Sequence, residues 1–226
     1  MECILIPESA KFIDKIIKDI APISLVISIS DSMLIQLVSC NNSLLTNVKL
    51  KDNFFEYFSV EKEFQFAIPK INFYMKNMRH LKLNLTEYLM KMEWKFDEYT
   101  YKREVYISDS SLQTILFQAN HLIRLDHVVM MEMLKHFKCN RILLSFKNKF
   151  LKIANLDGKN KISASIEIDT DMNENVEVPL ANFKKAFSCT EFIDSFTLCY
   201  EDGYSPLNFV INNSEYDISY FIAIFS

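Results

Sequence analysis

The chain has 226 residues, of which 50% are hydrophobic and 24% are charged, and its formal net charge at pH 7 is −4. This composition is typical of a globular protein rather than a disordered one, and the apolar runs are far shorter than the about 20 residues of a membrane helix. Gly158 and Gly203 are the only glycines, so glycine-rich phosphate-binding loops cannot form and the common nucleotide-dependent chemistries are disfavoured.

The first half of the chain is predicted to combine strands with two helices. A strand over 2–6 leads into a helix over 8–20, which has one apolar stripe at helical spacing. Alternating apolar residues predict strands at 25–30, 33–39, 43–50 and 63–68. We expect a second helix from Lys70, and then strands at 80–85, 88–96 and 100–108.

The second half repeats this order. A strand over 112–118 precedes a helix over 125–137, and strands follow at 141–146, 150–156 and 161–168. The pattern P-x-x-N-F occurs at Pro69 and again at Pro179, each time after an alternating run, and proline is favoured in the first turn of a helix. After the second P-x-x-N-F helix, strands are expected at 194–200, 206–212 and 215–225.

The repeat predicts two domains of similar size. The polar segment SDSS marks their junction, so we expect domain 1 over 1–108, a short hinge over 109–112 and domain 2 over 113–226. The last strand, within SEYDISYFIAIFS, is apolar on both faces near its end and is therefore expected to close the second domain rather than to form a tail.

Basic residues recur on the predicted helices, although the chain as a whole is acidic. A lysine face on one helix is typical of a solvated surface, but its recurrence at equivalent places favours a positive surface for a polyanion. Such binding would use phosphates rather than bases and would depend on salt. The residues expected to form this positive surface are Lys11, Lys15, Lys18, Lys76, Arg79, Lys135, Lys184 and Lys185.

A duplicated strand, helix and three-strand unit with basic helices on one side resembles the DNA sliding clamps, such as proliferating cell nuclear antigen. Within that family, residues 37–58 (LVSCNNSLLTNVKLKDNFFEYF) and the terminal SYFIAIF look most like the Rad-nine subunit of the heterotrimeric nine-one-one checkpoint clamp. The resemblance implies an α+β DNA-clamp fold, in which each domain packs two helices on a curved antiparallel sheet. It also implies a nuclear, non-enzymatic protein without a cofactor.

The resemblance further implies a ring that encircles duplex DNA and tethers repair and checkpoint factors. The expected partners are double-stranded DNA, bound without sequence specificity, two related subunits resembling Rad-one and Hus-one, an ATP-dependent clamp loader, and repair and checkpoint proteins. Ring closure would join the edge strands 100–108 and 159–168 of neighbouring subunits. The interface residues expected on these strands are Lys102, Glu104, Tyr106, Lys161, Ser163 and Ser165.

Two alternatives stay open. One is a divergent homotrimeric replication clamp, and the other is an α+β enzyme whose site is formed by residues that look ordinary in the sequence. The Rad-nine subunit also usually carries a long disordered C-terminal tail, whereas this sequence stops at Ser226.

The cysteines and acidic clusters give no sign of a disulfide framework or a metal centre. The five cysteines are scattered without a CxxC pair, which is typical of free thiols in a reducing compartment. Asp169, Asp171 and Asn173 open like a calcium-binding loop, but Glu174 and Leu180 stand where that loop needs glycine and glutamate. We therefore expect no metal site.

Overall fold

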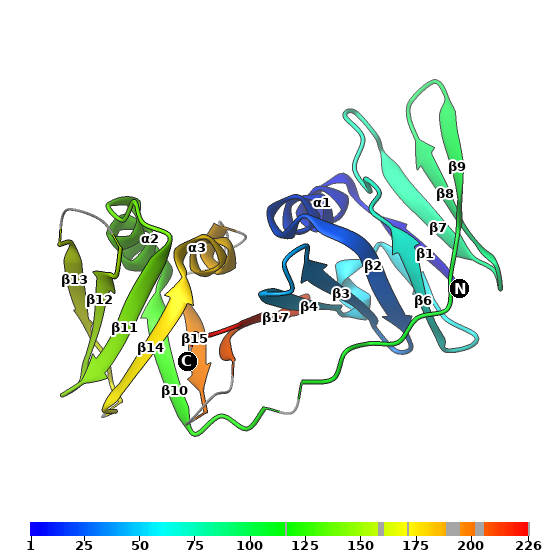
Figure 1. Cartoon of the computed structure of the whole chain (residues 1–226). Helices are drawn as coiled ribbons and strands as arrows, with labels where there is room; N and C mark the ends of the chain where they lie inside the picture. Colours follow the sequence, from blue (N-terminus) through cyan, green and yellow to red (C-terminus); the bar gives the residue numbers. More distant parts are fainter. Residues whose placement is uncertain (116, 158–160, 171, 189–194, 202–205, 226) are drawn as a thin grey trace. The chain divides into compact units, whose positions relative to one another are not determined.

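The computed structural model describes residues 1–115, 117–157, 161–170, 172–188, 195–201 and 206–225 (Figure 1). The contacts within the chain group it into two compact units. The first unit comprises Met1–Thr114 together with Asn212–Ile218, and the second comprises Ile115–Ile211 together with Ser219–Ser226. None of the helices formed by the described residues is long and apolar enough to cross a membrane.

The first unit contains one α-helix, one short 3-10 helix and two groups of antiparallel strands. Its first sheet has the order β5-β1-β7-β8-β9, and its second group has the order β4-β3-β2-β6. The elements are β1 (Glu2–Leu5), α1 (Pro7–Ile20), β2 (Pro22–Ile29), β3 (Met33–Ser39), β4 (Leu44–Leu50), η1 (Asp52–Phe54), β5 (Tyr57–Ser59), β6 (Phe64–Pro69), β7 (His80–Leu85), β8 (Leu89–Lys95) and β9 (Thr100–Tyr106).

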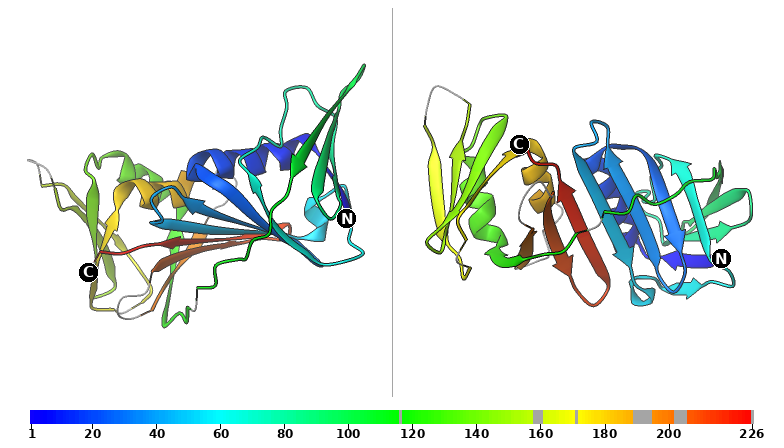
Figure 2. Two further views of the ribbon diagram at one scale, coloured as in Figure 1. Left: turned by 45° about the vertical axis from the view of Figure 1, so that its right-hand side comes forward. Right: turned by 60° about the horizontal axis from the view of Figure 1, so that its bottom comes forward.

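Helix α1 forms where the sequence predicts it. Pro7 occupies the first turn, where its missing N–H costs nothing, and Ala21 ends the helix in the left-handed conformation with φ 53°. The apolar stripe, which includes Ile13, Ile16 and Ile17, is buried against the sheet. Figure 2 shows α1 along one face of β2 and β3, so its opposite face is left for solvent or a ligand.

The prediction of a second helix in the first half, from Lys70, is wrong, because residues 70–79 form a loop. Both P-x-x-N-F copies bury their phenylalanine, since Phe73 and Phe183 are each 0% exposed. Only the second copy continues as a helix, because its sequence ANFKKAF is rich in good helix formers, whereas NFYMKN is not. The first unit therefore has one α-helix rather than the two predicted.

The segment Asn212–Ile218 belongs to the first unit although it is far away in sequence. The Lys51 N–H donates to the Glu215 carbonyl at 2.9 Å, and the Lys51 ammonium lies 2.9 Å from the Asp217 carboxylate. Tyr216 is 6% exposed, and its ring centroid lies 4.4 Å from that of Phe12 on α1. The start of the last strand thus helps to build the core of the first unit.

In the second unit, the described residues form two helices and two groups of antiparallel strands. One group has the order β13-β12-β11-β14 and the other the order β10-β15-β16-β17. In Figure 1 its two helices, α2 and α3, lie next to each other. The elements are β10 (His121–Asp126), α2 (His127–Lys135), β11 (Arg141–Lys147), β12 (Phe150–Asn155), β13 (Ser163–Glu167), β14 (Glu174–Pro179), α3 (Leu180–Ser188), β15 (Ser195–Tyr200), β16 (Leu207–Asn212) and β17 (Tyr216–Ile222), the last shared with the first unit at Ile218.

The first strand predicted for the second half is also misplaced. Residues 112–118 form no strand among their described positions, and the strand before α2 is β10 at His121–Asp126. Two residues of the 112–118 segment, one polar and one aromatic, make single contacts instead of the hydrogen-bond ladder of a strand. In the first unit Gln113 exchanges hydrogen bonds with Gln36 at 2.7 and 2.9 Å, and in the second the ring of Phe117 lies 6.1 Å from that of Phe221.

Candidate nucleic-acid and subunit interfaces

Two of the three α1 lysines expected to face DNA are exposed. Lys11 and Lys18 lie on the side of α1 opposite its buried stripe. Lys15 differs from the prediction, because its side chain is half-buried and its ammonium nitrogen is shielded from solvent. The basic face of α1 therefore centres on Lys11 and Lys18.

Lys76 and Arg79 belong to the loop that replaces the expected helix. Met78 N–H donates to the Met75 carbonyl at 3.2 Å, so residues 75–78 form a β-turn. Lys76 is at the second position of this turn and Asn77, with φ 66°, at the third, where asparagine tolerates a positive φ. Lys76 is exposed, whereas Arg79 is paired with the Asp97 carboxylate.

Asp14 of α1 has a structural role that the sequence pattern did not predict. Its two carboxylate oxygens accept the N–H groups of Phe73 and Tyr74 at 2.7 and 2.9 Å. Burial raises the pKa of the Asp14 carboxyl above its ordinary value, and the two backbone hydrogen bonds act in the opposite direction. Asp14 thus ties the loop 70–79 to α1.

Two of the basic residues predicted for the second unit have partners within that unit. Lys135 forms an ion pair with Glu132, one helical turn earlier on α2. The Lys184 ammonium donates to the Phe137 carbonyl at 3.1 Å, and Lys184 and Lys185 are both half-buried. Lys135 is exposed but paired, and Lys184 is half-buried and bonded to the backbone, so that neither is a bare outward lysine. Their contact with DNA stays a prediction.

The predicted interface strand β9 lies at an edge of its sheet and pairs with β8 alone among the described strands. The Ile107 N–H donates to the Tyr88 carbonyl, so the odd-numbered residues around β9 are those that hydrogen-bond to β8. The backbone groups of the even-numbered residues point toward the open edge. These residues include the three predicted there, Lys102, Glu104 and Tyr106.

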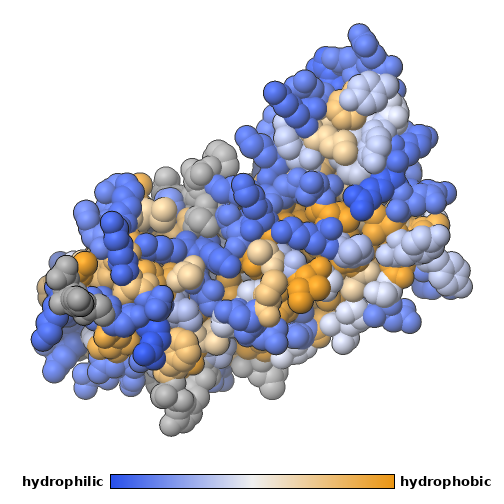
Figure 3. Space-filling model, turned by 45° about the horizontal axis from the view of Figure 1, so that its top comes forward, coloured by the Kyte–Doolittle hydropathy of each residue, from blue (hydrophilic) through white to orange (hydrophobic). Residues whose placement is uncertain are grey.

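The side chains of these even-numbered residues of β9 lie on one face of the sheet and are polar and exposed. Lys102 lies 3.0 Å from Glu93, Glu104 lies 3.4 Å from Lys91, and Tyr106 is 80% exposed. Figure 3 shows mainly hydrophilic surface over the sheet formed by β7, β8 and β9. Charged and polar side chains of this kind keep an open strand soluble until a partner strand covers it.

The second predicted interface strand, β13, also lies at a sheet edge and pairs with β12. The Ile168 N–H donates to the Lys149 carbonyl at 2.8 Å, so the even-numbered residues bond to β12. The backbone groups of Ser163, Ser165 and Glu167 therefore point outward, while the predicted Lys161 is exposed just before the strand.

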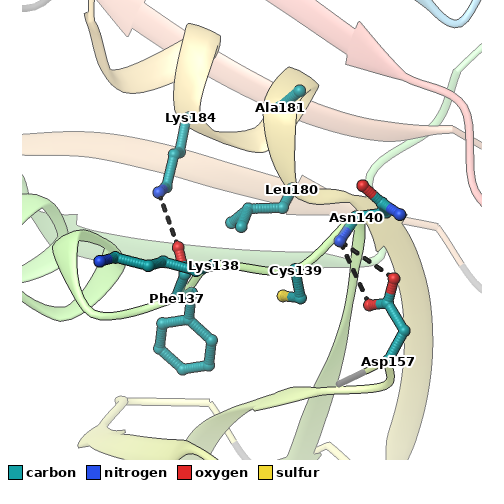
Figure 4. Close-up of a pocket in the computed structure, with 8 residues that line it drawn as sticks. All are labelled: Phe137, Lys138, Cys139, Asn140, Asp157, Leu180, Ala181 and Lys184. Carbon is teal, nitrogen blue, oxygen red and sulfur yellow. Dashed lines mark hydrogen bonds between the residues drawn. The ribbon is translucent and has the colours of Figure 1, made fainter. Parts of the chain in front are cut away.

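An open pocket of about 470 Å³ lies in the second unit where α3 begins, lined in part by Cys139, Asp157 and Lys184 (Figure 4). The N–H groups of Arg141 and Asn140 hold the pKa of the Asp157 carboxyl below its ordinary value. Burial raises the pKa of the Cys139 thiol, which is the wrong direction for a nucleophile. The polar groups of this pocket stabilise the turn before β11 rather than converge on a substrate.

The cysteines and the possible metal ligands likewise form no reactive site among the described residues. Cys3, Cys40, Cys139 and Cys199 are free thiols, and burial raises the pKa of the Cys3 thiol to about 12. Cys189 and Asp171 lie outside the described residues. Within the described part of the chain, no group of three His, Cys, Asp or Glu side chains could hold a metal ion.

Solved structures of sliding clamps match this fold over essentially the whole chain. The PCNA2–PCNA3 complex of Sulfolobus tokodaii matches with a TM-score of 0.78 and 13% identity, and covers 99% of this chain and 99% of that one. Proliferating cellular nuclear antigen of Entamoeba histolytica matches with a TM-score of 0.78 and 12% identity over 100% of this chain and 98% of that one. The chain has the DNA-clamp fold.

At the level of sequence there is no comparable match: no protein-family model and no curated protein matches the chain. The α+β clamp fold that the resemblance implied is thus confirmed, with three α-helices and antiparallel sheets among the described residues. Identities of 12 and 13% extend the likeness to the fold and no further.

Proposed function

We propose that the chain is a subunit of a ring-shaped DNA sliding clamp and acts by encircling duplex DNA rather than by catalysis. The observation that carries this proposal is the clamp fold across the whole chain, together with an open edge strand in each unit. A strand edge with unpaired N–H and C=O groups is a template for a strand of another chain. Two different edges on one chain make a head-to-tail contact, which closes into a ring if the rotation permits.

The exposed lysines of the first unit supply the surface for DNA. Lys11 and Lys18 on α1 and Lys76 on the loop carry unpaired positive charge, as far as the described residues show. Contacts from lysines to phosphates attract the duplex without fixing a sequence, which suits a ring that must slide.

Within the clamp class, we place the chain in a heterotrimeric checkpoint clamp of the nucleus, in the position of the Rad-nine subunit. The resemblance of residues 37–58 and of the terminal SYFIAIF to that subunit supports this assignment. The Sulfolobus tokodaii structure, a complex of PCNA2 and PCNA3, supports assembly from two different clamp chains. Such a ring needs an ATP-dependent loader and tethers repair and checkpoint factors.

Charge reversal tests the DNA surface. Lys11, Lys18 and Lys76 are changed together to Glu, and retention of the assembled clamp on a linear duplex with free ends, from which a closed ring can slide off, is measured over a range of salt concentrations. Three lost phosphate contacts lower the slope of log affinity against log salt by about 2.7. Retention should fall while assembly persists, and normal retention would overturn the proposal.

The matched control for that variant reverses three other exposed lysines of the first unit. Lys49, Lys62 and Lys95 lie on β4, the loop before β6 and β8. Because both variants change the net charge equally, a general charge effect would weaken retention in both. The proposal requires the loss to be confined to Lys11, Lys18 and Lys76.

A homotrimeric replication clamp is the second candidate, and one feature of the strand edges favours it. If β9 pairs with β13 of a second copy, one antiparallel register sets Lys102 opposite Glu167 and Val105 opposite Ala164. The purified chain then sediments as a trimer of three times 26.6 kDa, whereas a subunit of the heterotrimer sediments alone as a monomer.

A further inference from the structure

The loop 70–79 stands where the repeat predicts a helix, and it is fastened to α1 and to the sheet. The Asp14 carboxylate accepts the N–H groups of Phe73 and Tyr74, with distances of 2.7 and 2.9 Å. The Phe73 carbonyl, which a helix would offer to the N–H four residues later, accepts the Trp94 indole N–H at 2.8 Å. Trp94 is 1% exposed, so this anchor lies in the core.

These anchors fix the direction of the turn that follows. The chain from Tyr74 passes directly into the turn at 75–78, whose backbone hydrogen bond and positive φ at Asn77 leave it little freedom. After the turn, the Arg79 N–H donates to the Lys95 carbonyl at 2.7 Å. Lys76 is therefore held at the tip of a short turn that is tied on both sides.

The position of Asp14 on α1 decides which charges the loop joins. Lys11 precedes Asp14 by three residues and Lys18 follows it by four, so both are its neighbours on the helix surface. No acidic residue occurs between Glu63 and Glu87, so the loop adds only positive charge. The negative charge of Asp14 is directed into the two backbone N–H groups rather than toward the lysines.

We propose that Asp14 is a positioning residue which holds the loop 70–79 so that Lys76 joins Lys11 and Lys18 in one site for the phosphates of duplex DNA. This inference rests on the proposed function, since it names the residues that form its DNA surface. The loop thus takes over the role of the missing helix, and an acidic residue strengthens the binding of a polyanion.

An ordinary surface acid weakens the binding of a polyanion, whereas Asp14 is expected to strengthen it. Replacing Asp14 therefore tests the inference. Binding of a labelled duplex of mixed sequence is measured by anisotropy between about 50 and 200 mM salt. Asp14→Ala should weaken binding about 3-fold at the higher salt and lower the salt slope by about 0.9, as Lys76→Gln does. The control Glu8→Gln, which removes an exposed acid from the same helix, should leave binding equal or tighter.

A double variant separates positioning from loss of structure. Asp14→Ala with Lys76→Gln should bind no more weakly than Lys76→Gln alone, because both changes remove the same contact. Asp14→Ala with Lys11→Gln should bind more weakly than either single variant, because the α1 contact is still present. Amide exchange at Phe73 and Tyr74 should accelerate in Asp14→Ala, while exchange in α1 stays slow.

The outcomes also distinguish this inference from the proposed function. If the assembled clamp with the unaltered chain shows no salt-dependent binding of the duplex, both are overturned. If it binds but Asp14→Ala binds equally or more tightly, or if the losses from Asp14→Ala and Lys76→Gln multiply, only the positioning role of Asp14 is overturned.

Discussion

Replacing Lys102 by proline tests the open edge of β9 without disturbing the sheet behind it. The register directs the Lys102 N–H away from β8, so proline removes no hydrogen bond within the first unit. In an assembled ring that N–H would be paired with a strand of the neighbouring subunit. Its loss removes one net hydrogen bond of about 1 kcal/mol and leaves a partner carbonyl unpaired at about 1 to 3 kcal/mol.

The interface is therefore expected to lose about 2 to 4 kcal/mol, which weakens association about 30- to 1,000-fold. Analytical ultracentrifugation over a range of concentrations measures this loss in the assembled clamp, and circular dichroism reports the fold. Arg103→Pro is the matched control, because the Arg103 N–H faces β8 and its removal should damage the fold itself. Assembly of Lys102→Pro with unchanged affinity would refute the edge-strand interface.

Two further predictions concern stability. Tyr216→Ala should lower the free energy of unfolding of the first unit by about 3 to 5 kcal/mol in urea titrations, because it empties a buried site against Phe12 and Phe54; a loss under about 1 kcal/mol would show that Asn212–Ile218 is not part of that core. Asp157 contributes stability that is present above the ordinary carboxyl pKa and is lost as the pH falls through the lower folded-state pKa, so Asp157→Asn should flatten the acid limb of the stability curve. An unchanged acid limb would contradict that role.

Local patterns were sufficient to predict the elements whose burial is decided by their own sequence. Helix α1 has five apolar residues on one stripe, and most strands alternate over six or seven residues, so their type follows from period alone. The position of β9 and β13 at sheet edges could also be predicted from the sequence. Their side chains are mostly polar, whereas a strand covered on both sides is usually apolar.

The sequence predictions fail where residues far away in the chain form hydrogen bonds with the backbone groups or side chains concerned. The loop 70–79 follows a proline that favours a helix, but Asp14 and Trp94 take up its N–H and carbonyl groups. The engagement of Lys184 by the Phe137 carbonyl likewise depends on a partner 47 residues away. The pairing of Lys135 with Glu132 could have been predicted, since a spacing of three on a helix brings opposite charges together.

If the chain belongs to a ring closed around DNA, the ring can leave the DNA only where the DNA has an end. The native complex is loaded on nicked circular DNA fixed to beads, washed at about 1 M salt, where contacts of exposed charges are screened, and then treated with a nuclease that cuts the circle once. We expect the complex to survive the wash and to leave only when the DNA is linearised. Release by salt alone, or retention after linearisation without blocked ends, would contradict it.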